Sequence, residues 1–223
     1  MMISDWRSAR VVANDRAAQE MISLTLAPES RVPHRAGQHY ELRFPGEELS
    51  RKYSIINGPA RFDTLEFGVQ VLPTGMISPR LARTVPGDRL EIRGPLGESF
   101  FWEPSHGPSL VLLGAGAGIT PLLSIYEHFC LTFPDRTCLF HVSAKHPNRI
   151  YRYVRYKPHI ATRFTAMESR FGKEDLALAL AGRSIDPDSP ARLCGPPRFI
   201  ESMVDSLIDL GFPETGIRSE TFL

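Results

Sequence analysis

The sequence predicts two domains of different architecture: an N-terminal six-stranded antiparallel β-barrel and a C-terminal α/β domain built on a parallel sheet. Short apolar or alternating runs, separated by Gly and Pro, occupy the chain up to about residue 102. Turn residues then interrupt the pattern, and the second half alternates apolar runs with helical segments. With 223 residues, of which 42% are apolar and 23% charged, the chain is long enough to bury two modest cores.

The barrel strands are expected to be short. In the run 65–71, apolar side chains at every second position form one face, while Glu66, Gly68 and Gln70 form the other. One face is therefore core and the other faces solvent or a ligand. The expected strands are 10–12, 21–26, 39–44, 51–55, 65–71 and 89–92.

The domain boundary is expected in the turn-rich segment 103–108, which gives domains of 1–105 and 106–223. Strands that alternate with helices favour a parallel sheet with both faces covered. The expected elements of the second domain are strands at 109–113, 137–142, 162–167 and 191–194 and helices at 121–131 and 198–210.

Charge and composition exclude several classes of protein. A formal net charge of +1 gives no global attraction to nucleic acid or to an anionic membrane. No run of about eighteen apolar residues is present to span a bilayer, and Asp5 and Arg7 stand where a secretory signal would be apolar. Three widely spaced cysteines argue against a disulfide framework and a four-cysteine metal or iron–sulfur site. We expect a cytoplasmic monomer.

A glycine-rich turn, Gly114–Pro121, follows the apolar strand at 109–113. Glycines let a backbone approach an anion closely, and a helix N-terminus offers unpaired N–H donors with a partial positive charge. The turn therefore predicts a pyrophosphate site, with Gly114, Gly116, Gly118 and Pro121 as candidate residues. The alternative is a plain strand-to-helix turn, since Ile119 occupies the sixth position of the usual Gly-x-Gly-x-x-Gly fingerprint.

A second candidate segment is Arg51–Ile55, in which alternation places Arg51 and Tyr53 on one face of a strand. An arginine can pair with a phosphate, a tyrosine can stack on a flat ring, and the Ser54 hydroxyl can bond a ring nitrogen. Taken alone, the segment is more typical of an edge strand with a surface arginine.

In combination, five short segments make the chain resemble the ferredoxin-NADP reductase superfamily. They are, in order, Arg51-x-Tyr53-Ser54, Gly75–Ser78, Gly114–Pro121, Cys194–Pro196 and Glu220–Phe222. Asn57–Pro59 and Ser78–Leu81 are most similar to the bacterial ferredoxin-NADP(+) reductases, and Gly94–Gly97 is also common in reductase components of oxygenases. The resemblance covers nearly the whole chain and implies a flavin-binding barrel followed by an NAD(P)-binding α/β domain.

For the barrel, the resemblance implies a flavin site. Arg51 would contact the flavin pyrophosphate, Tyr53 would stack on the isoalloxazine, and Ser54 would hydrogen-bond near its reactive nitrogen. The segment formed by Gly75, Met76, Ile77 and Ser78 would hold the flavin phosphates.

For the second domain, the resemblance implies a nicotinamide site. Thr120 and Cys194 would flank the nicotinamide, although Cys194 is equally well explained as a buried structural thiol. Glu220 would help to deliver protons. Phe222 would cover the flavin or simply pack. It departs from plant-type members, which often end in Tyr, because this position is Phe and one further residue, Leu223, follows it.

The nucleotide preference is expected to depend on residues beyond the second strand of the sheet. No Asp or Glu stands at the end of the 137–142 strand to bond a ribose 2′-hydroxyl. Lys145 and the pair Ser169 and Arg170 are the candidates for holding a 2′-phosphate, where two charge-assisted bonds would favour NADPH over NADH by about a hundredfold. The alternative is that Lys145 and Arg170 are solvated surface charges.

These observations predict an FAD-dependent NADPH oxidoreductase that passes electrons, by hydride transfer and then single-electron steps, to a separate ferredoxin, flavodoxin or oxygenase component. FAD is preferred to FMN by the closest resemblance and by an aromatic run that could stack an adenine. The alternatives are an NAD(P)H:free-flavin reductase and a non-catalytic flavin-binding regulatory subunit. The aromatic run is Phe100, Phe101 and Trp102, and the expected basic rim for an acidic partner is Arg31, His34, Arg35, Arg80 and Arg83.

Overall fold

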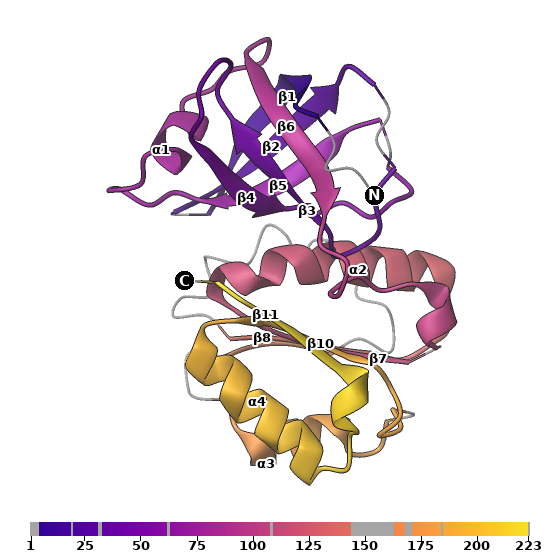
Figure 1. Ribbon diagram of the computed structural model, residues 1–223. Coiled ribbons are helices and arrows are strands. Elements are labelled where there is room, and N and C mark those ends of the chain that lie inside the picture. The colour runs from indigo at the N-terminus through magenta and orange to yellow at the C-terminus, as the bar shows by residue number, and fades with distance from the viewer. Residues whose placement is uncertain are drawn as a thin grey trace.

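The computed structural model describes residues 5–18, 20–30, 33–61, 63–107, 109–143, 163–167, 171–183 and 185–222. Two sheets of different type lie one above the other, with helix α2 (Ile119–Thr132) between them (Figure 1). The predicted fold class, an antiparallel barrel followed by a parallel-sheet α/β domain, is confirmed. The predicted boundary between residues 105 and 106 falls inside a short 3-10 helix, η1 (Pro104–His106), and stays a prediction.

The first domain is a six-stranded antiparallel sheet with the order β4-β3-β6-β1-β2-β5. A bridge between Ile55 and Phe67 joins the end of β4 to β5, so the sheet closes on itself. The strands are β1 (Arg7–Ala18), β2 (Met21–Pro28), β3 (His39–Arg43), β4 (Ser50–Ser54), β5 (Leu65–Gln70) and β6 (Arg89–Leu96). A short helix, α1 (Ser78–Leu81), lies at one side of the barrel (Figure 1).

The alternation expected in β5 is present, but its second face has an unexpected neighbour. Leu65, Phe67 and Val69 point into the barrel core and are buried. Gly68, on the other face, is also buried, because Thr120 of α2 packs against it. This face of β5 therefore contacts the second domain.

The second domain is a five-stranded parallel sheet with the order β11-β10-β7-β8-β9. Its strands are β7 (Leu110–Ala115), β8 (Cys138–Ser143), β9 (Arg163–Met167), β10 (Ala191–Gly195) and β11 (Ile217–Thr221). Helices α3 (Lys173–Leu180) and α4 (Pro197–Asp209) cover the face away from the barrel (Figure 1). Two 3-10 helices, η2 (Gly116–Gly118) and η5 (Glu214–Gly216), precede α2 and β11.

Helix α2 is buried on several sides because it packs against both sheets. All residues from Ile119 to Tyr126 are buried, and a helix that is apolar all round is typical of such a position. One apolar cluster joins barrel residues such as Ile56 and Trp102 to Ile119 and Phe140 of the second domain. None of the helices in the described parts of the chain is both long and apolar enough to cross a bilayer.

Hydrogen bonds and an ion pair also connect α2 to the barrel loop that follows β4. Ser124 Oγ donates a hydrogen bond of 3.0 Å to the carbonyl oxygen of Asn57, which is buried. The Glu127 carboxylate accepts a hydrogen bond from the Gly58 N–H and pairs with Arg61 at 2.9 Å. The Asn57–Pro59 segment, whose sequence resembles the bacterial ferredoxin-NADP(+) reductases, therefore contacts the second domain.

Candidate functional site

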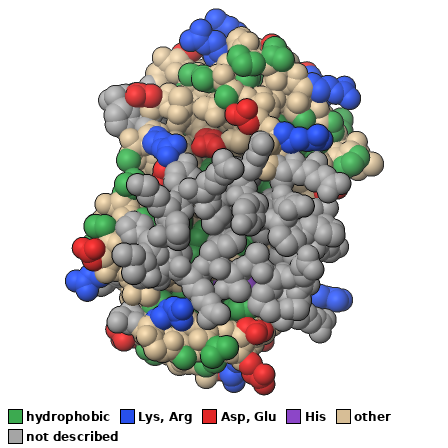
Figure 2. Space-filling model, turned by 180° about the vertical axis from the view of Figure 1, so that it is seen from behind, with side chains coloured by type: hydrophobic (Ala, Val, Ile, Leu, Met, Phe, Trp, Pro, Cys, Tyr) green, Lys and Arg blue, Asp and Glu red, His purple; other side chains and the backbone are tan. Residues whose placement is uncertain are grey.

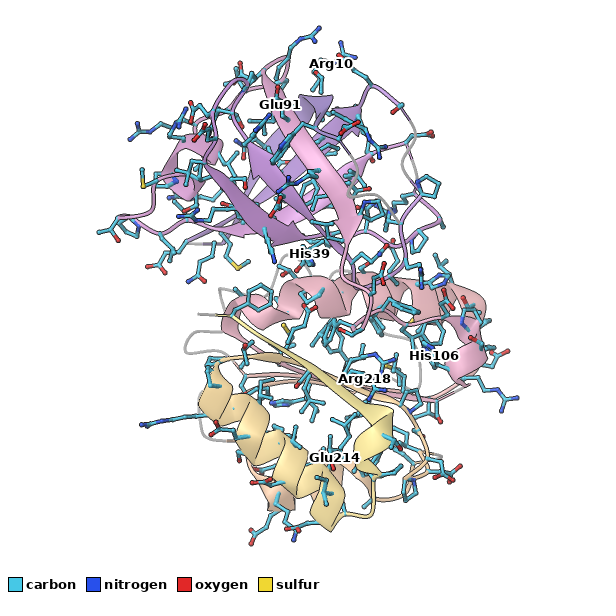
Figure 3. All side chains as sticks on the ribbon, viewed as in Figure 1. Arg10, His39, Glu91, His106, Glu214 and Arg218 are labelled. Atoms are coloured by element: carbon cyan, nitrogen blue, oxygen red, sulfur yellow. The ribbon has the colours of Figure 1, made fainter. Side chains whose placement is uncertain are left out.

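A cleft of about 800 Å³ lies where β4 of the barrel faces the end of β11. We call it the β4–β11 cleft. Its lining residues are His39, Glu41, Ser50, Arg51, Lys52, Ser54, Ser219, Glu220, Thr221 and Phe222. His39 lies at the barrel edge that faces the second domain (Figure 3). The cleft brings together four of the predicted site residues from distant parts of the sequence: Arg51, Ser54, Glu220 and Phe222.

The register of β3 and β4 determines which side chains share a face. Tyr53 lies opposite Tyr40, and Arg51 lies opposite Leu42, so Arg51 and Tyr53 share one face of β4 as expected. Tyr53 is half-buried against the barrel core, and burial raises its pKa to about 12, so the phenol is neutral. Arg51 is exposed, and the hydrogen bond seen for it within the described residues is to the Ser50 carbonyl oxygen at 2.8 Å. Its guanidinium is therefore available to an anion.

The opposite face of β4 adds charged groups to the cleft. Lys52 lies opposite Glu41, whose carboxylate accepts a hydrogen bond of 2.7 Å from Arg93 Nε. Burial raises the pKa of Glu220, and the Lys52 ammonium across the cleft partly opposes this shift. Burial, followed by the Lys52 charge, lowers the pKa of His39. Glu220 therefore holds a proton at higher pH than an ordinary carboxyl group does.

Sequence reasoning missed His39 and Lys52. Lys52 stands inside the matched Arg-x-Tyr-Ser segment, so strand alternation offered a signal that it lines the cleft from the other face. His39 is the register partner of Ser54, and strand register is not readable from this sequence alone.

Ser54 and Cys194 are both buried, but only Ser54 lines the cleft. Cys194 is fully buried in the apolar cluster around α2. Burial, with a smaller contribution from the Glu220 charge, raises the pKa of the Cys194 thiol well above its usual value. The geometry favours a neutral, packed thiol at this position, and the predicted place of Cys194 beside a nicotinamide stays a prediction.

The glycine turn connects β7 to α2 through η2 and is tightly packed. A Cβ atom on Gly118 would lie 2.1 Å from the Cys194 carbonyl oxygen, so only glycine lets the turn approach β10 this closely. Gly116 has a φ of +57°, in the left-handed region that favours glycine. Gly114 packs against Leu122, and Pro121 is buried near the start of α2.

Thr120 lies at the junction of the turn and the barrel. Its Oγ1 donates a hydrogen bond of 3.0 Å to the Ala117 carbonyl oxygen, and its methyl group packs against Gly68 of β5. The side chain is only 3% exposed, so it contributes to the packing of the two domains. Whether it also flanks a nicotinamide stays a prediction.

The segment Gly75–Ser78 lies outside the β4–β11 cleft and ends at the first residue of α1. Ser78 is buried, and its Oγ accepts a hydrogen bond of 3.1 Å from the Leu72 N–H. Gly75 N–H bonds the Leu72 carbonyl oxygen at 2.8 Å, Ile77 is buried, and Met76 is 66% exposed. These contacts organise a tight turn, and its predicted contact with flavin phosphates stays a prediction.

Three predicted nucleotide-binding residues, Lys145, Ser169 and Arg170, lie outside the described residues. The preference for NADPH therefore stays a prediction.

The prediction that the aromatic run at 100–102 stacks on an adenine is wrong for two of its three residues. Phe100 and Trp102 are buried, and Trp102 packs on Phe129 with ring centroids 5.3 Å apart. Phe101 is half-buried, and the Arg35 guanidinium lies 4.2 Å from its ring centroid and so covers one face of the ring. Apolar packing between the domains explains this run.

The expected basic rim is also incorrect in part. His34 is only 7% exposed, and Arg80 is paired with Glu47 at 2.6 Å. Arg35 lies 3.7 Å from Glu103, and Arg31 is outside the described residues. On the face shown in Figure 2, basic and acidic side chains are interspersed over the barrel and form no single basic field.

The structure combines an antiparallel barrel, a parallel sheet with a glycine turn and a polar cleft between the two domains. Residues 10–101 match the family described as oxidoreductase FAD-binding domain. Among solved structures, the cytochrome P450 reductase of Amycolatopsis is 26% identical with a TM-score of 0.84, over 98% of this chain and 70% of that chain. The ferredoxin NADP+ reductase of Neisseria gonorrhoeae, solved with bound FAD and NADP, shares the fold with a TM-score of 0.80 at 20% identity, over 98% of this chain and 99% of that one.

Two curated relatives add to this likeness. The reductase component of propane 2-monooxygenase from Gordonia sp. (strain TY-5) is 33% identical over 62% of this chain and 40% of its own length. The flavohemoprotein of Bordetella pertussis is 29% identical over 97% of this chain and 60% of its own length. The chain therefore spans less than two thirds of the length of each of these relatives. Residues 10–101 of this chain thus match an oxidoreductase FAD-binding domain, and the chain as a whole is similar to ferredoxin reductase-like flavoprotein oxidoreductases.

Proposed function

We propose that this chain is an FAD-dependent reductase that takes hydride from NADPH and passes electrons singly to an acceptor protein. The observation that carries the proposal is the β4–β11 cleft, because it joins an exposed guanidinium, a buried hydroxyl and an acid of raised pKa in one place. Its volume of about 800 Å³ lies in the range typical of cofactor sites. An aromatic side chain, Phe222, lines the same cleft.

The residues of the cleft fit a flavin. Arg51 would pair with phosphate, and Tyr53, which is next to the lining residues on β4 but does not line the cleft itself, would present a flat ring to the isoalloxazine. Ser54 would donate a hydrogen bond to a ring nitrogen, and Phe222 would exclude water from the ring. When bound, FAD supplies the capacity to accept hydride and to release single electrons.

Glu220 is the group in this cleft suited to hold a proton. Its pKa is raised by burial, so a larger share of the carboxyl groups is protonated at mildly acidic pH than for an exposed glutamate. The share falls as the pH rises through that pKa. Glu220 lies on β11 of the second domain and lines the cleft beside the barrel, so it would donate this proton to a group bound in the cleft.

The second domain supports the nucleotide half of the proposal. The glycine turn ends β7 at the carboxyl edge of the parallel sheet, where open α/β sheets bind ligands. Thr120 and Cys194 lie at this edge and would be near the nicotinamide. Lys145, Ser169 and Arg170 would hold the 2′-phosphate and so favour NADPH over NADH.

The proposed acceptor is an oxygenase component or a ferredoxin, with a flavodoxin as a further candidate. Support comes from relatives named as the reductase component of propane 2-monooxygenase and as the ferredoxin reductase in carbazole 1,9a-dioxygenase. Hydride transfer to a flavin followed by single-electron release is the chemistry that such acceptors require.

Purification with added FAD tests the flavin site. We expect the wild-type chain to keep FAD through gel filtration, and Arg51→Ala to lose most of it, because a charge-assisted bond to phosphate contributes about 1.5 to 3 kcal/mol. Arg89→Ala is the matched control, since Arg89 is an exposed arginine of β6 that does not line the cleft. Retention by Arg51→Ala equal to the control would remove Arg51 from the site.

A further inference from the structure

A second cleft, of about 510 Å³, lies at the other end of β11 and has no part in the proposed electron transfer. We call it the Arg192 cleft. Its lining residues are Glu98, Ser99, Phe101, His106, Asp188, Pro190, Arg192, Thr215, Gly216 and Arg218. The first four come from the segment between the two sheets, and the others from the second domain. Figure 3 shows His106 and Arg218 near each other, with His39 of the β4–β11 cleft farther along the same face.

Arg192 is a charged side chain in an unusual environment. It is only 5% exposed, and arginine is rarely buried without an acidic partner. Its Nε and Nη2 donate to the Phe101 carbonyl oxygen at 3.3 and 3.1 Å, and Nη1 donates to the Ala191 carbonyl oxygen at 3.0 Å. Among the described residues no carboxylate forms an ion pair with it. These neutral carbonyl acceptors bring no negative charge to the guanidinium, and the bonds leave one N–H of Nη1 for a further acceptor.

A second guanidinium increases the positive potential of this cleft. Arg218 donates through Nη1 to the carbonyl oxygens of Thr215 and Ile217, at 2.8 and 2.9 Å, and forms no ion pair within the described residues. Burial, followed by repulsion from Arg218, lowers the pKa of Arg192 to about 10. Arg192 therefore keeps its charge at neutral pH, and the Arg218 guanidinium is near enough to repel it. A bound anion would relieve this repulsion.

Two rings give the cleft an apolar, flat part. The rings of Phe101 and His106 have centroids 5.7 Å apart at an interplanar angle of 34°. His106 Nδ1 accepts hydrogen bonds from the Glu103 N–H at 3.2 Å and from Arg192 Nη2 at 3.5 Å. Burial, followed by the Arg192 charge, lowers the pKa of His106, so the imidazole is neutral. A neutral planar ring of a ligand can pack against this wall.

The acids of the cleft limit how much negative charge a ligand can carry. Glu98 and Asp188 are both exposed, so they act from the solvent side and are screened, whereas Arg192 is buried. They would repel a polyanion more than a compact single anionic group.

We propose that the Arg192 cleft binds a small organic anion in which one carboxylate or phosphate group is attached to a planar ring. The anionic group would pair with the guanidiniums of Arg192 and Arg218, and the ring would pack against Phe101 and His106. Because the cleft spans the segment between the sheets and the start of β11, such a ligand would contact both domains.

Titration calorimetry on the FAD-loaded protein tests this site with three probes: benzoate, AMP and inorganic phosphate. We expect saturable binding of benzoate or AMP, tighter than that of phosphate. Arg218→Gln should weaken it by about tenfold to a hundredfold, from the loss of one charge-assisted contact. Arg218 is exposed, so this variant should fold, and Arg89→Gln, an exposed arginine of the barrel, should bind like the wild type.

Three outcomes would contradict the proposal that the Arg192 cleft binds such an anion. They are no saturable binding of any probe, equal affinity in Arg218→Gln and the wild type, or phosphate binding as tightly as the two ring compounds. AMP that binds equally well to both proteins would be occupying the nucleotide edge of the sheet instead. FAD content and hydride transfer are measured separately, so failure here leaves the proposed reductase function unaffected.

Discussion

Gly118→Ala is expected to destabilise the second domain by about 3 kcal/mol or more, at the upper end for overpacking a dense site. The added Cβ would lie 2.1 Å from the Cys194 carbonyl oxygen, 2.4 Å from its carbonyl carbon and 2.8 Å from the Gly195 nitrogen. These are backbone atoms of β10, so no side-chain rotation can relieve the contact. Urea or thermal unfolding of the variant measures the loss.

Gly216→Ala is the matched control for this prediction. Gly216 also lies in a 3-10 helix, but the nearest atom to a Cβ there is 3.8 Å away. Its stability should change by less than about 0.5 kcal/mol. If Gly118→Ala and Gly216→Ala lose the same free energy of unfolding, the close approach of the turn to β10 is wrong.

Gly118→Ala should still retain FAD, because the barrel strands are not altered, but reduction of the flavin by NADPH should be lost.

The second large effect is expected at the contact between the domains. A Cβ on Gly68 would lie 2.3 Å from Thr120 Cγ2, so Gly68→Ala should cost about 1 to 3 kcal/mol of stability. The Thr120 side chain cannot easily turn away, because its Oγ1 is hydrogen-bonded to the Ala117 carbonyl oxygen. Denaturant unfolding of the single variant gives the cost.

A double variant identifies the cause of that cost. Thr120→Ser removes the methyl group but keeps the hydroxyl, so Gly68→Ala with Thr120→Ser should recover most of the stability lost by Gly68→Ala alone. The coupling free energy should be at least about 1 kcal/mol, as for residues in direct contact. Simple additivity of the two changes would show that β5 and α2 do not meet at this point.

The fold was largely predictable because its elements differ in hydrophobic period. The helix at 121–131 is observed as α2 (Ile119–Thr132), and the helix at 198–210 as α4 (Pro197–Asp209). Strand β11 was not predicted as a strand. It is an edge strand, and only Ile217 of its five residues is buried, so its sequence lacks the apolar character that marks the inner strands.

The candidate site was predictable only where short segments had a recognisable chemistry. Arg51, Ser54, Glu220 and Phe222 meet in one cleft as the order of the segments implied. His39 and Lys52 were missed because their place depends on strand register and on the approach of β11, which are tertiary features. The aromatic run at 100–102 was misassigned because burial between two domains cannot be told from exposure by composition.

The most direct test of the proposed function is an anaerobic titration of the FAD-loaded protein with NADPH and, separately, NADH, followed by flavin absorbance. We predict that about one equivalent of NADPH bleaches the flavin, and that NADH does so with an apparent affinity lower by about a hundredfold. Equal efficiency of the two nucleotides would contradict the NADPH preference alone. Flavin that stays oxidised with both would contradict the central claim that this chain is a hydride-accepting reductase.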